Sequence, residues 1–443
     1  MTSARPALSR AVVPLPAAPV RIVHLGLGAF HRAHQAWYTA RADDAGEWGI
    51  AAFTGRRPDA AEALRLQDGL YTLVERGPER DRAEIVGSLV EAVDGADIRR
   101  LVELLSSPEV AIVTLTVTEA GYRLTPDGDP DLGDPELAWD IAALRDTISV
   151  DGPVDGLAPT TTVGRLLTGL EARRRAGAAR IAIVPCDNVP GNGAFVRRGV
   201  LGAARLVGED LADFVEGAVA FVSTSVDRIT PRTTEADVMD LNSRADRVDR
   251  SPVFTEPFSD WVLSGEFPAG RPAWERAGAR FVDDIEPWER RKLWLLNGAH
   301  TLLALAGPPR GHETVASAIG DPVLLSAVER FWDEACRHLP DSLGLATYRH
   351  ALLDRFANAR IEHRLAQIAE DSTRKVRLRI VPVAEAELAA GRTASGCAFV
   401  LAAWVRAEGA SGYGQTAAGL ARLSGILPAD RSFVQDVAEL RRS

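Results

Sequence analysis

Short continuous runs of apolar residues recur along the first two thirds of the chain, separated by amphipathic stretches. Four runs predict buried strands, at residues 22–25, 48–53, 110–117 and 181–184, and residues 84–89 form a fifth strand candidate. Uninterrupted apolar runs are typical of parallel strands that are covered on both faces. Amphipathic stretches at residues 30–43, 98–105 and 166–177 predict helices between the strands. The alternation predicts a doubly wound α/β domain.

Beyond about residue 289 the pattern changes to helical periodicity without comparable strands. The helix candidates are residues 290–306, 322–337, 347–356, 361–369, 385–391 and 398–407. We therefore expect an α/β fold with a doubly wound domain at residues 21–285 and a mostly α-helical domain at residues 286–443. Residues 1–20 contain two arginines and four prolines. Because the prolines interrupt any apolar core of an export signal, we expect a disordered leader there.

A glycine turn follows the first predicted strand. Gly26 and Gly28 stand between strand 22–25 and helix 30–43, in the order of a dinucleotide-binding βαβ unit. Such glycines let the backbone approach a pyrophosphate at the start of the helix. The third glycine of the motif is replaced by His31. A plain strand-to-helix turn therefore stays open as an alternative.

The charge balance narrows the range of partners. With 61 acidic residues against 51 lysines and arginines, the formal net charge is −10. This balance argues against nucleic acid and anionic membranes as partners. No apolar stretch approaches the ~18 residues of a membrane span. Three scattered cysteines suit neither a disulfide framework nor a zinc knuckle. We expect a soluble cytoplasmic protein in the reduced state.

Only two of the 51 basic residues are lysines, Lys292 and Lys375. Arginine is always protonated, whereas a lysine can be tuned to release its proton near neutral pH. On an α-helix at about 100° per residue, Lys292 lies at 0°, Asn297 at about 140° and His300 at about 80°. The three side chains lie within one polar arc of an otherwise apolar helix. They could act as a general base, an amide donor and a proton-sharing imidazole, respectively. The alternative is a solvent-directed lysine beside a capped asparagine and a core histidine.

Polar residues also follow two of the predicted parallel strands. Asn188 follows strand 181–184 and Glu119 follows strand 110–117, at the strand ends where ligands bind in doubly wound folds. Asn188 could donate to a developing alkoxide, or form an Asx turn. Glu119 is a candidate site carboxylate, or a helix cap.

Two further polar groups have open interpretations. His31 and His34 lie three residues apart, and contacts to a cofactor or to the core are favoured over a metal. Asp227 could position a substrate or pair locally with Arg228.

Several common catalytic patterns are missing from the sequence. The Tyr-x-x-x-Lys pair of short-chain dehydrogenases is absent, because Trp288 and Asp371 stand four residues before the two lysines. No Cys/His/Glu set suits a catalytic zinc ion. No G-x-x-x-x-G-K-[ST] motif indicates a phosphate-binding loop. We therefore expect no metal.

The order of motifs resembles the mannitol dehydrogenase family, the polyol-specific long-chain dehydrogenases, and within it the fructuronate reductase and mannitol 2-dehydrogenase branch. The resemblance rests on segments 26–34, 115–122, 186–188, 226–231, 256–258, 270–274 and 292–300. It implies a Rossmann-type NAD-binding domain, a helical second domain and metal-independent hydride transfer with NAD.

The resemblance also implies a role for each matching residue. Lys292 matches the general acid/base, Asn188 and Asn297 the amides that hold the reacting oxygen, His300 the neighbouring histidine, and Glu119 an acid that exchanges protons with solvent. Asp227 and Lys375 match substrate-binding residues. Gly26, Gly28, Phe30 and His31 match the cofactor-binding turn, and Asp59 the carboxylate that favours NAD through the ribose. Arg56 and Arg57, beside Asp59, could instead accept the 2′-phosphate of NADP.

The segment 361–367 resembles the fructuronate reductase branch in particular. His363 and Arg364 are expected to bind a uronate carboxylate, or else to form a surface turn. The favoured substrate pair is D-mannonate and D-fructuronate, followed by D-mannitol and D-fructose. Mannitol 1-phosphate 5-dehydrogenase activity, arabinitol dehydrogenase activity and a non-catalytic NAD-binding sensor stay as alternatives.

Overall fold

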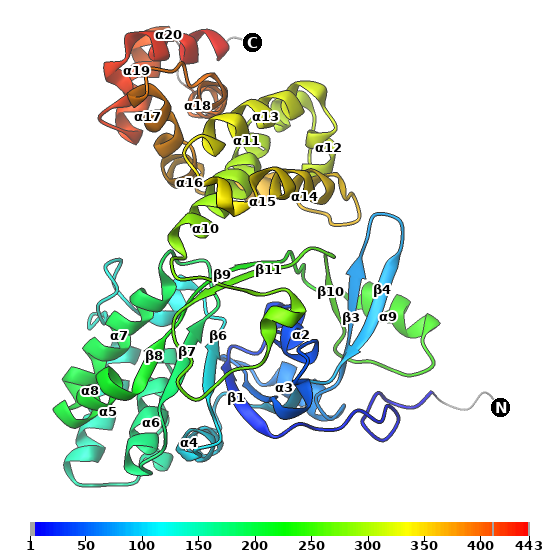
Figure 1. Ribbon diagram of the computed structural model, residues 1–443, viewed down its shortest axis with the longest axis vertical. Helices are drawn as coiled ribbons and strands as arrows, with labels where there is room; N and C mark the ends of the chain where they lie inside the picture. The colour runs from blue at the N-terminus through cyan, green and yellow to red at the C-terminus, as the bar shows by residue number, and fades with distance from the viewer. Residues whose placement is uncertain (1–4, 410–411, 442–443) are drawn as a thin grey trace. The chain divides into compact units, whose positions relative to one another are not determined.

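The computed structural model describes residues 5–409 and 412–441, which form two compact units (Figure 1). The first unit contains the chain up to Arg76 and Arg80–Ile285, and the second contains Gly77–Glu79 and the chain from Glu286 onward. The first unit is built on a parallel sheet and the second on helices. The predicted fold class, a Rossmann-type domain followed by a helical domain, is confirmed.

The main sheet of the first unit has six parallel strands. Their order across the sheet is β5 (Leu89–Val93), β2 (Gly49–Phe53), β1 (Val20–Leu25), β6 (Ile112–Leu115), β7 (Ile181–Pro185) and β8 (Val219–Phe221). The chain proceeds outward from β1 in one direction and then returns to begin again at β6. The strand order therefore reverses between β1 and β6, which creates the crevice where doubly wound folds bind ligands.

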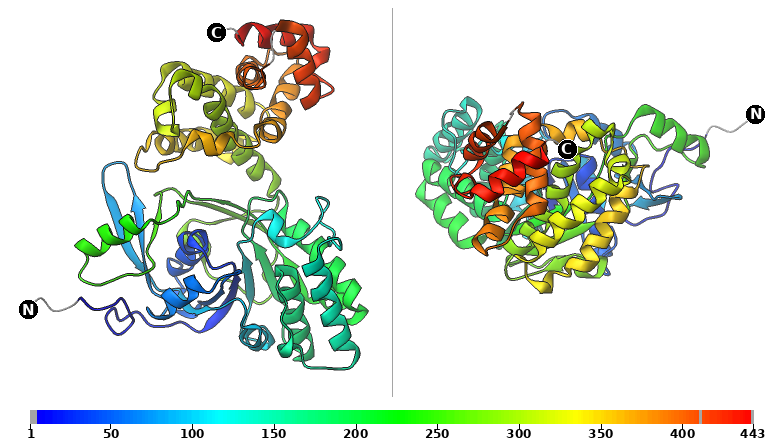
Figure 2. Two further views of the ribbon diagram at one scale, coloured as in Figure 1. Left: turned by 180° about the vertical axis from the view of Figure 1, so that it is seen from behind. Right: turned by 90° about the horizontal axis from the view of Figure 1, so that it is seen from above.

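Both faces of this sheet are covered, which explains the uninterrupted apolar runs. Val23 and Leu25 pack into one core cluster, whereas Ile22 packs into the other. Five helices cover the first face: α4 (Ile98–Ser106), α5 (Pro135–Ser149), α6 (Thr162–Arg175), α7 (Asn192–Val207) and α8 (Glu209–Ala218). Helices α2 (Gln35–Ala40) and α3 (Asp59–Arg65) lie on the opposite face (Figures 1 and 2).

The helix predicted at residues 30–43 is divided. Helix α1 (Ala29–Ala33) ends at His34, which has φ −121° and ψ −89°, and α2 follows. The imidazole of His34 is buried and contacts the carbonyl oxygen of Asp260 at 3.2 Å. The prediction of one continuous helix at residues 30–43 is therefore wrong, because the backbone of His34 is not helical.

Two small sheets flank the main one, and the apolar pattern indicated only residues 84–86 of their strands. One contains β10 (Val253–Thr255), β3 (Tyr71–Arg76) and β4 (Asp81–Val86), and the other β12 (Arg280–Phe281), β11 (Asp260–Ser264) and β9 (Ser223–Asp227). The strand predicted at residues 84–89 is thus divided between β4 and β5. Helix α9 (Glu235–Arg244) precedes β10.

The leader is ordered over its described part, so the expectation of disorder is corrected for residues 5–19. Leu8 is fully buried, and its amide donates to the carbonyl of Val248. The guanidinium of Arg10 donates to the carbonyls of Leu15 and Gly87. These tertiary contacts hold a proline-rich segment in place without regular secondary structure. Residues 1–4 lie outside the described residues.

The second unit is helical. Its helices are α10 (Glu286–Arg291), α11 (Ala299–Ala306), α12 (Val315–Ile319), α13 (Pro322–Cys336), α14 (Leu345–Ala357), α15 (Leu365–Ala369), α16 (Ser372–Arg379), α17 (Val381–Ala389), α18 (Ser395–Ala407), α19 (Gly412–Leu423) and α20 (Arg431–Leu440). Trp332, Phe331 and Trp404 are fully buried in its core. The continuous α-helix predicted at residues 290–306 is wrong in its middle, because η5 (Lys292–Gly298) is a π-helix between α10 and α11.

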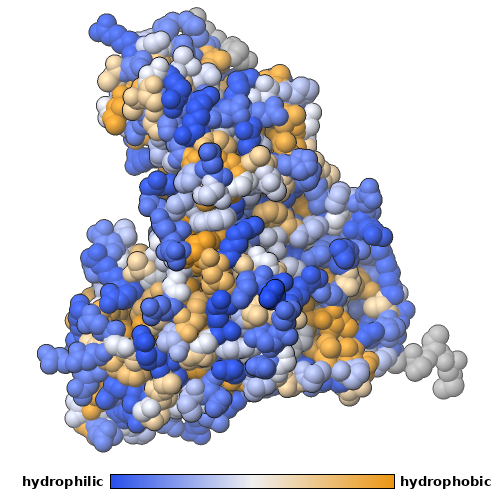
Figure 3. All heavy atoms as spheres, viewed as in Figure 1, coloured by the Kyte–Doolittle hydropathy of each residue, from blue (hydrophilic) through white to orange (hydrophobic). Residues whose placement is uncertain are grey.

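The surface is mixed in character. On the face shown in Figure 3, hydrophilic residues are interspersed with smaller hydrophobic groups. None of the described helices combines the length and the apolar character that crossing a membrane requires.

Candidate active site

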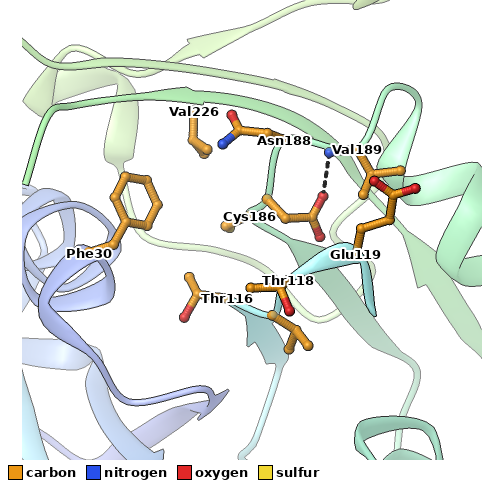
Figure 4. A pocket seen from close by; sticks show the side chains of 10 residues that line it. Phe30, Thr116, Thr118, Glu119, Cys186, Asn188, Val189 and Val226 are labelled. Carbon is orange, nitrogen blue, oxygen red and sulfur yellow. Dashed lines mark hydrogen bonds between the residues drawn. The ribbon is translucent and has the colours of Figure 1, made fainter. Parts of the chain in front are cut away.

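A cavity of about 410 Å³ in the first unit lies at the carboxyl ends of β6 and β7. It brings together three residues that the sequence singled out, Phe30, Glu119 and Asn188 (Figure 4). Its remaining lining residues are Thr116, Val117, Thr118, Cys186, Asp187, Val189 and Val226. Because β6 adjoins the point where the strand order reverses, the cavity is placed where a doubly wound fold binds its ligand.

The glycine turn closes against the end of β6. Gly26 has φ +112°, and a Cβ atom there would lie 2.4 Å from the carbonyl oxygen of Thr116. The Thr116 hydroxyl also donates to the Gly26 carbonyl at 2.8 Å. Only glycine fits the backbone conformation and the space at this position. Around Gly28, in contrast, a Cβ would meet nothing closer than 3.6 Å, so the turn leaves room for a ligand at its outer side.

His31 is part of the core. Its ring is fully buried and stacks on His24 with the ring centroids 3.4 Å apart. Burial, followed by the charges of His24 and Arg32, lowers the pKa of His31 well below its usual value. The side chain therefore supports the glycine turn from within. Because the ring is completely buried, no part of the imidazole surface is accessible to a cofactor. His34 is buried as well, so both side chains contact the core.

Asp59 lies at the start of α3, six residues beyond the end of β2. Its carboxylate is exposed and lies 3.8 Å from the guanidinium of Arg57. An exposed pair of this kind holds neither group firmly. Both a ribose-binding carboxylate and a phosphate-binding arginine are thus available at this corner of the unit.

The loop after β7 is held by Asp187. Its Oδ1 accepts a hydrogen bond from the Val189 amide at 3.0 Å, drawn as a dashed line in Figure 4. The Asx turn therefore belongs to Asp187. Pro190 has no N–H group, so the residue two positions after Asn188 cannot close the corresponding turn. Asn188 is exposed at the cavity wall, where its amide can face a ligand.

Asp187 is itself supported by Tyr122, which the sequence analysis quoted within a motif but assigned no role. The buried Tyr122 hydroxyl donates to Asp187, and the Asn192 amide adds a contact at 3.3 Å. Burial raises the pKa of Asp187, while the hydrogen bonds from Tyr122 and Val189 lower it and the charge of Glu119 raises it. An acid that directly follows a buried strand was the only signal that could have indicated this network.

Asp227 ends β9 and is 8% exposed. It lies opposite Asp260 in the antiparallel pair with β11. The neighbouring Arg228 is buried and forms an ion pair with Glu75 at 2.7 Å. The ion pair of Arg228 is therefore formed with Glu75, which is remote in the sequence. Substrate binding by Asp227 stays a proposal.

In the second unit, Lys292 and Asn297 are half-buried on the π-helix, and His300 follows on α11 with 7% of its surface exposed. The His300 ring contacts those of Phe356 and His363, with centroids 4.9 and 4.8 Å away. Burial, then the charge of His363 and those of two arginines, lowers the pKa of His300 well below its usual value. His300 is therefore a neutral imidazole at neutral pH.

Lys375, His363 and Arg364 do not share one role. The Lys375 ammonium donates to the Ile368 carbonyl at 3.0 Å, and burial, followed by the charge of Arg379, lowers its pKa. Arg364 forms an exposed ion pair with Glu362 at 2.6 Å, as the surface-turn alternative predicts. His363 instead faces His300.

Arg379 joins this group, although no sequence pattern indicated it. Its guanidinium donates to the Asn297 carbonyl at 3.3 Å and to the Thr301 hydroxyl at 3.1 Å. Burial lowers its pKa to about 10. Within the described part of the chain, no carboxylate forms an ion pair with Arg379. Its charge is thus partly desolvated and uncompensated, which favours an anionic ligand.

Comparison with known proteins identifies the family. Residues 20–276 match the mannitol dehydrogenase Rossmann domain, and residues 284–416 match the mannitol dehydrogenase C-terminal domain. The chain belongs to the mannitol dehydrogenase family. It is therefore a polyol or aldonate dehydrogenase, as the order of motifs led us to expect.

Three relatives illustrate the range of the family. D-mannonate oxidoreductase of Escherichia coli is 34% identical over 399 residues, which cover 87% of this chain and 79% of that protein. Mannitol 2-dehydrogenase of Pseudomonas fluorescens, solved as a ternary complex with NAD and D-mannitol, is 32% identical with a TM-score of 0.77, covering 96% and 92% of the two chains. A substrate-free D-sorbitol dehydrogenase is 27% identical with a TM-score of 0.86, covering 98% and 97%.

Proposed function

We propose that the protein catalyses the NAD-dependent interconversion of D-mannonate and D-fructuronate. The observation that carries this choice over a neutral polyol is the uncompensated charge of Arg379 beside Asn297. A carboxylate would form charge-assisted hydrogen bonds with such a guanidinium, and a hydroxyl would not balance its charge. The similarity to D-mannonate oxidoreductase supports the same choice. D-mannitol and D-fructose are the second candidate pair, supported by the similarity to mannitol 2-dehydrogenase.

Each proposed role follows from the chemistry of the side chain. Lys292 accepts the proton of the reacting hydroxyl during oxidation and returns it during reduction. The amides of Asn188 and Asn297 donate hydrogen bonds to the oxygen as it gains negative charge. His300, neutral because it is buried, orients the same oxygen without adding a competing charge. NAD, when bound, accepts the hydride.

Further residues would complete the reaction. Glu119 is exposed at the cavity wall, a position from which a carboxylate can exchange protons with water. Asp227 would bind a substrate hydroxyl. We propose that Lys375 and His363 bind the substrate with Arg379. Arg364 is a weaker candidate for the carboxylate than in the sequence-based expectation, because Glu362 already pairs with it.

The proposed preference for NAD over NADP rests on the glycine turn and on the segment after β2 that contains Arg57 and Asp59. The open outer side of Gly28 and the half-buried ring of Phe30 suit a dinucleotide, and Asp59 suits the ribose of NAD. The exposed Arg57 nearby would accept a 2′-phosphate if Asp59 were neutralised. We therefore expect Asp59→Asn to raise the KM for NAD and to lower the KM for NADP.

The deciding experiment is a substrate panel. NADH formation is measured with D-mannonate, D-mannitol, D-arabinitol and mannitol 1-phosphate, and NADH consumption with D-fructuronate and D-fructose. The proposal predicts the highest kcat/KM for the mannonate pair, with Arg379→Gln lowering it about 10-fold to 100-fold more than it lowers any turnover of mannitol. A higher kcat/KM for mannitol, with both activities lowered equally by Arg379→Gln, would establish the second pair.

The general-base role has its own test. Lys292→Arg cannot release a proton near neutral pH, so we expect turnover to fall by at least about 100-fold with NADH binding unchanged. Near-normal turnover in this variant would refute the role. NADH binding without turnover of any panel substrate in the unmodified protein would instead indicate a sensor.

A further inference from the structure

The π-helix changes which side chains share a face. In a continuous α-helix, Lys292 and Asn297 would lie about 140° apart around the axis. In a π-helix the backbone bonds run from residue i to residue i+5, so residues five apart follow one another along the same face. Lys292 and Asn297 have this separation and lie within η5. The π-helix is therefore what allows both side chains to address one atom.

A π-helix is rare because its hydrogen bonding is less favourable than that of an α-helix, and it persists where surrounding contacts support it. One contact comes from Trp332 on α13. Its indole N–H donates to the carbonyl of Leu295, in the middle of η5, at 2.7 Å. Trp332 and Leu295 are both fully buried, so no water can replace this donor. The bond fixes one carbonyl of the π-helix from outside it.

A second contact fixes the carbonyl of Asn297 itself. The Thr301 hydroxyl donates to it at 3.0 Å, and Arg379 adds the bond described above. Gly298, the next residue, permits close packing against α13, because a Cβ there would lie 2.6 Å from the ring of Phe331. The end of the π-helix is thus defined by polar contacts on the Asn297 carbonyl and by steric contact beside it.

We propose that Trp332 and Thr301 are positioning residues, which hold residues 292–298 as a π-helix and so keep Lys292 and Asn297 on one face. This inference rests on the proposed function, in which both side chains act on the reacting oxygen. Neither Trp332 nor Thr301 would touch substrate or cofactor. Their effect would be exerted through the geometry of the segment they support.

The test uses two variants that remove a donor and keep most of the side-chain volume, Trp332→Phe and Thr301→Val. Because a misplacement of about 1 Å in catalytic geometry costs on the order of 100-fold in rate, we expect kcat to fall about 10-fold to 100-fold in each. The KM for NAD should change less than about 3-fold, since the glycine turn is unaltered. The pH profile of kcat/KM should also shift, because Lys292 would no longer face the same neighbours.

Matched control variants separate positioning from general loss of stability. Trp274→Phe removes a buried indole donor to the Thr39 hydroxyl at 3.0 Å in the first unit, and Thr416→Val removes a hydroxyl donor to the Gly412 carbonyl at 2.9 Å in an ordinary helix. We expect melting temperatures to fall by similar amounts in variants and controls, with kcat and its pH profile unchanged in the controls.

The outcomes are distinguishable. If Lys292→Arg abolishes turnover while Trp332→Phe and Thr301→Val keep the kcat and pH profile of their controls, the positioning role is refuted and the proposed function stands. If one variant fails to fold, the other decides by the same criterion. If Lys292→Arg keeps normal turnover, the general-base role of Lys292 fails and the positioning role fails with it, while the substrate panel still decides the proposed reaction.

Discussion

The hydrogen bond from Tyr122 to Asp187 offers a sensitive test of the physical reasoning, because it supports a half-buried acid beside Asn188. The Tyr122 hydroxyl donates to the Asp187 carboxylate, and Tyr122 is fully buried. Replacing Tyr122 with Phe keeps the ring and removes only this donor. The Val189 and Asn192 contacts to Asp187 would stay in place.

The size of the effect should depend on pH. Burial raises the pKa of Asp187 in the folded protein, and the Tyr122 bond limits that rise. A carboxyl whose pKa is raised by folding stabilises the fold below its unfolded pKa, and this contribution is lost as pH rises through the folded pKa. Without Tyr122 the folded pKa rises further. Hydrogen bonds to charged groups contribute about 1.5–3 kcal/mol and those between neutral groups about 0.5–1.5 kcal/mol. We therefore expect the larger loss at pH 7.5 and the smaller at pH 4.

Thermal unfolding followed by circular dichroism at pH 4 and pH 7.5 measures both losses. For a unit of this size about 1 kcal/mol corresponds to roughly 2–4 °C, so Tyr122→Phe should lower Tm by roughly 3–10 °C at pH 7.5. Tyr71→Phe is the matched control, since the buried Tyr71 hydroxyl donates at 2.6 Å to a neutral backbone carbonyl, that of Arg32. Its loss should be the same at both pH values. Equal, pH-independent losses in both variants would refute the reasoning.

Three further variants test other parts of the structure. Gly26→Ala combines a strained φ with a 2.4 Å approach to the Thr116 carbonyl, so NADH affinity should fall at least about 10-fold in a fluorescence titration and stability by about 1–3 kcal/mol. Burial lowers the pKa of His24 to about 3, so the unfolded chain takes up a proton that the folded chain excludes. His24 should therefore contribute up to about 1.4 kcal/mol per pH unit to a loss of stability below about pH 6.5, beside the contributions of the buried His31 and His300, and His24→Asn should lessen this slope by that amount in urea denaturation. The buried Glu334 accepts the amides of Gly396 and Cys397 at 2.7 and 2.8 Å, so Glu334→Ala should lower the unfolding free energy by about 1–3 kcal/mol in thermal melts.

The main sheet was predictable because strands that are buried on both faces have uninterrupted runs of apolar residues. Strands β6 and β7 are apolar at nearly every position, and their runs had no competing interpretation. Strand β4 does not have an uninterrupted apolar run, because Asp81, Arg82 and Ala83 are exposed. Strand β4 pairs with β3, and no local sequence pattern indicates this pairing. The leader was misjudged for a related reason, because the Leu8 amide is paired with the carbonyl of Val248, which is remote in the sequence.

The residues of the cavity were predictable to the extent that they follow strands. Asn188 and Glu119 were selected because they succeed β7 and β6, and those strands are neighbours in the sheet. The sequence offered no comparable rule for Tyr122, whose contact with Asp187 requires that the loops after both strands meet. It offered none for Arg379 either, because the missing carboxylate partner is visible only when the surrounding side chains are in place.

The spacing Lys292-x4-Asn297-x2-His300 acquires its physical meaning from the change of helix type. On an α-helix throughout, the first two side chains diverge by about 140°, and no single oxygen would be within reach of both. With a π-helix from Lys292 to Gly298 and an α-helix from Ala299 onward, Asn297 follows Lys292 by one π-helical turn, and His300 follows Asn297 by three residues, close to one α-helical turn. All three then fall along one stripe. The apolar pattern could not reveal this, since the leucines between them are buried equally well in either helix. The helix type is decided by donors such as Trp332, which lie outside the segment.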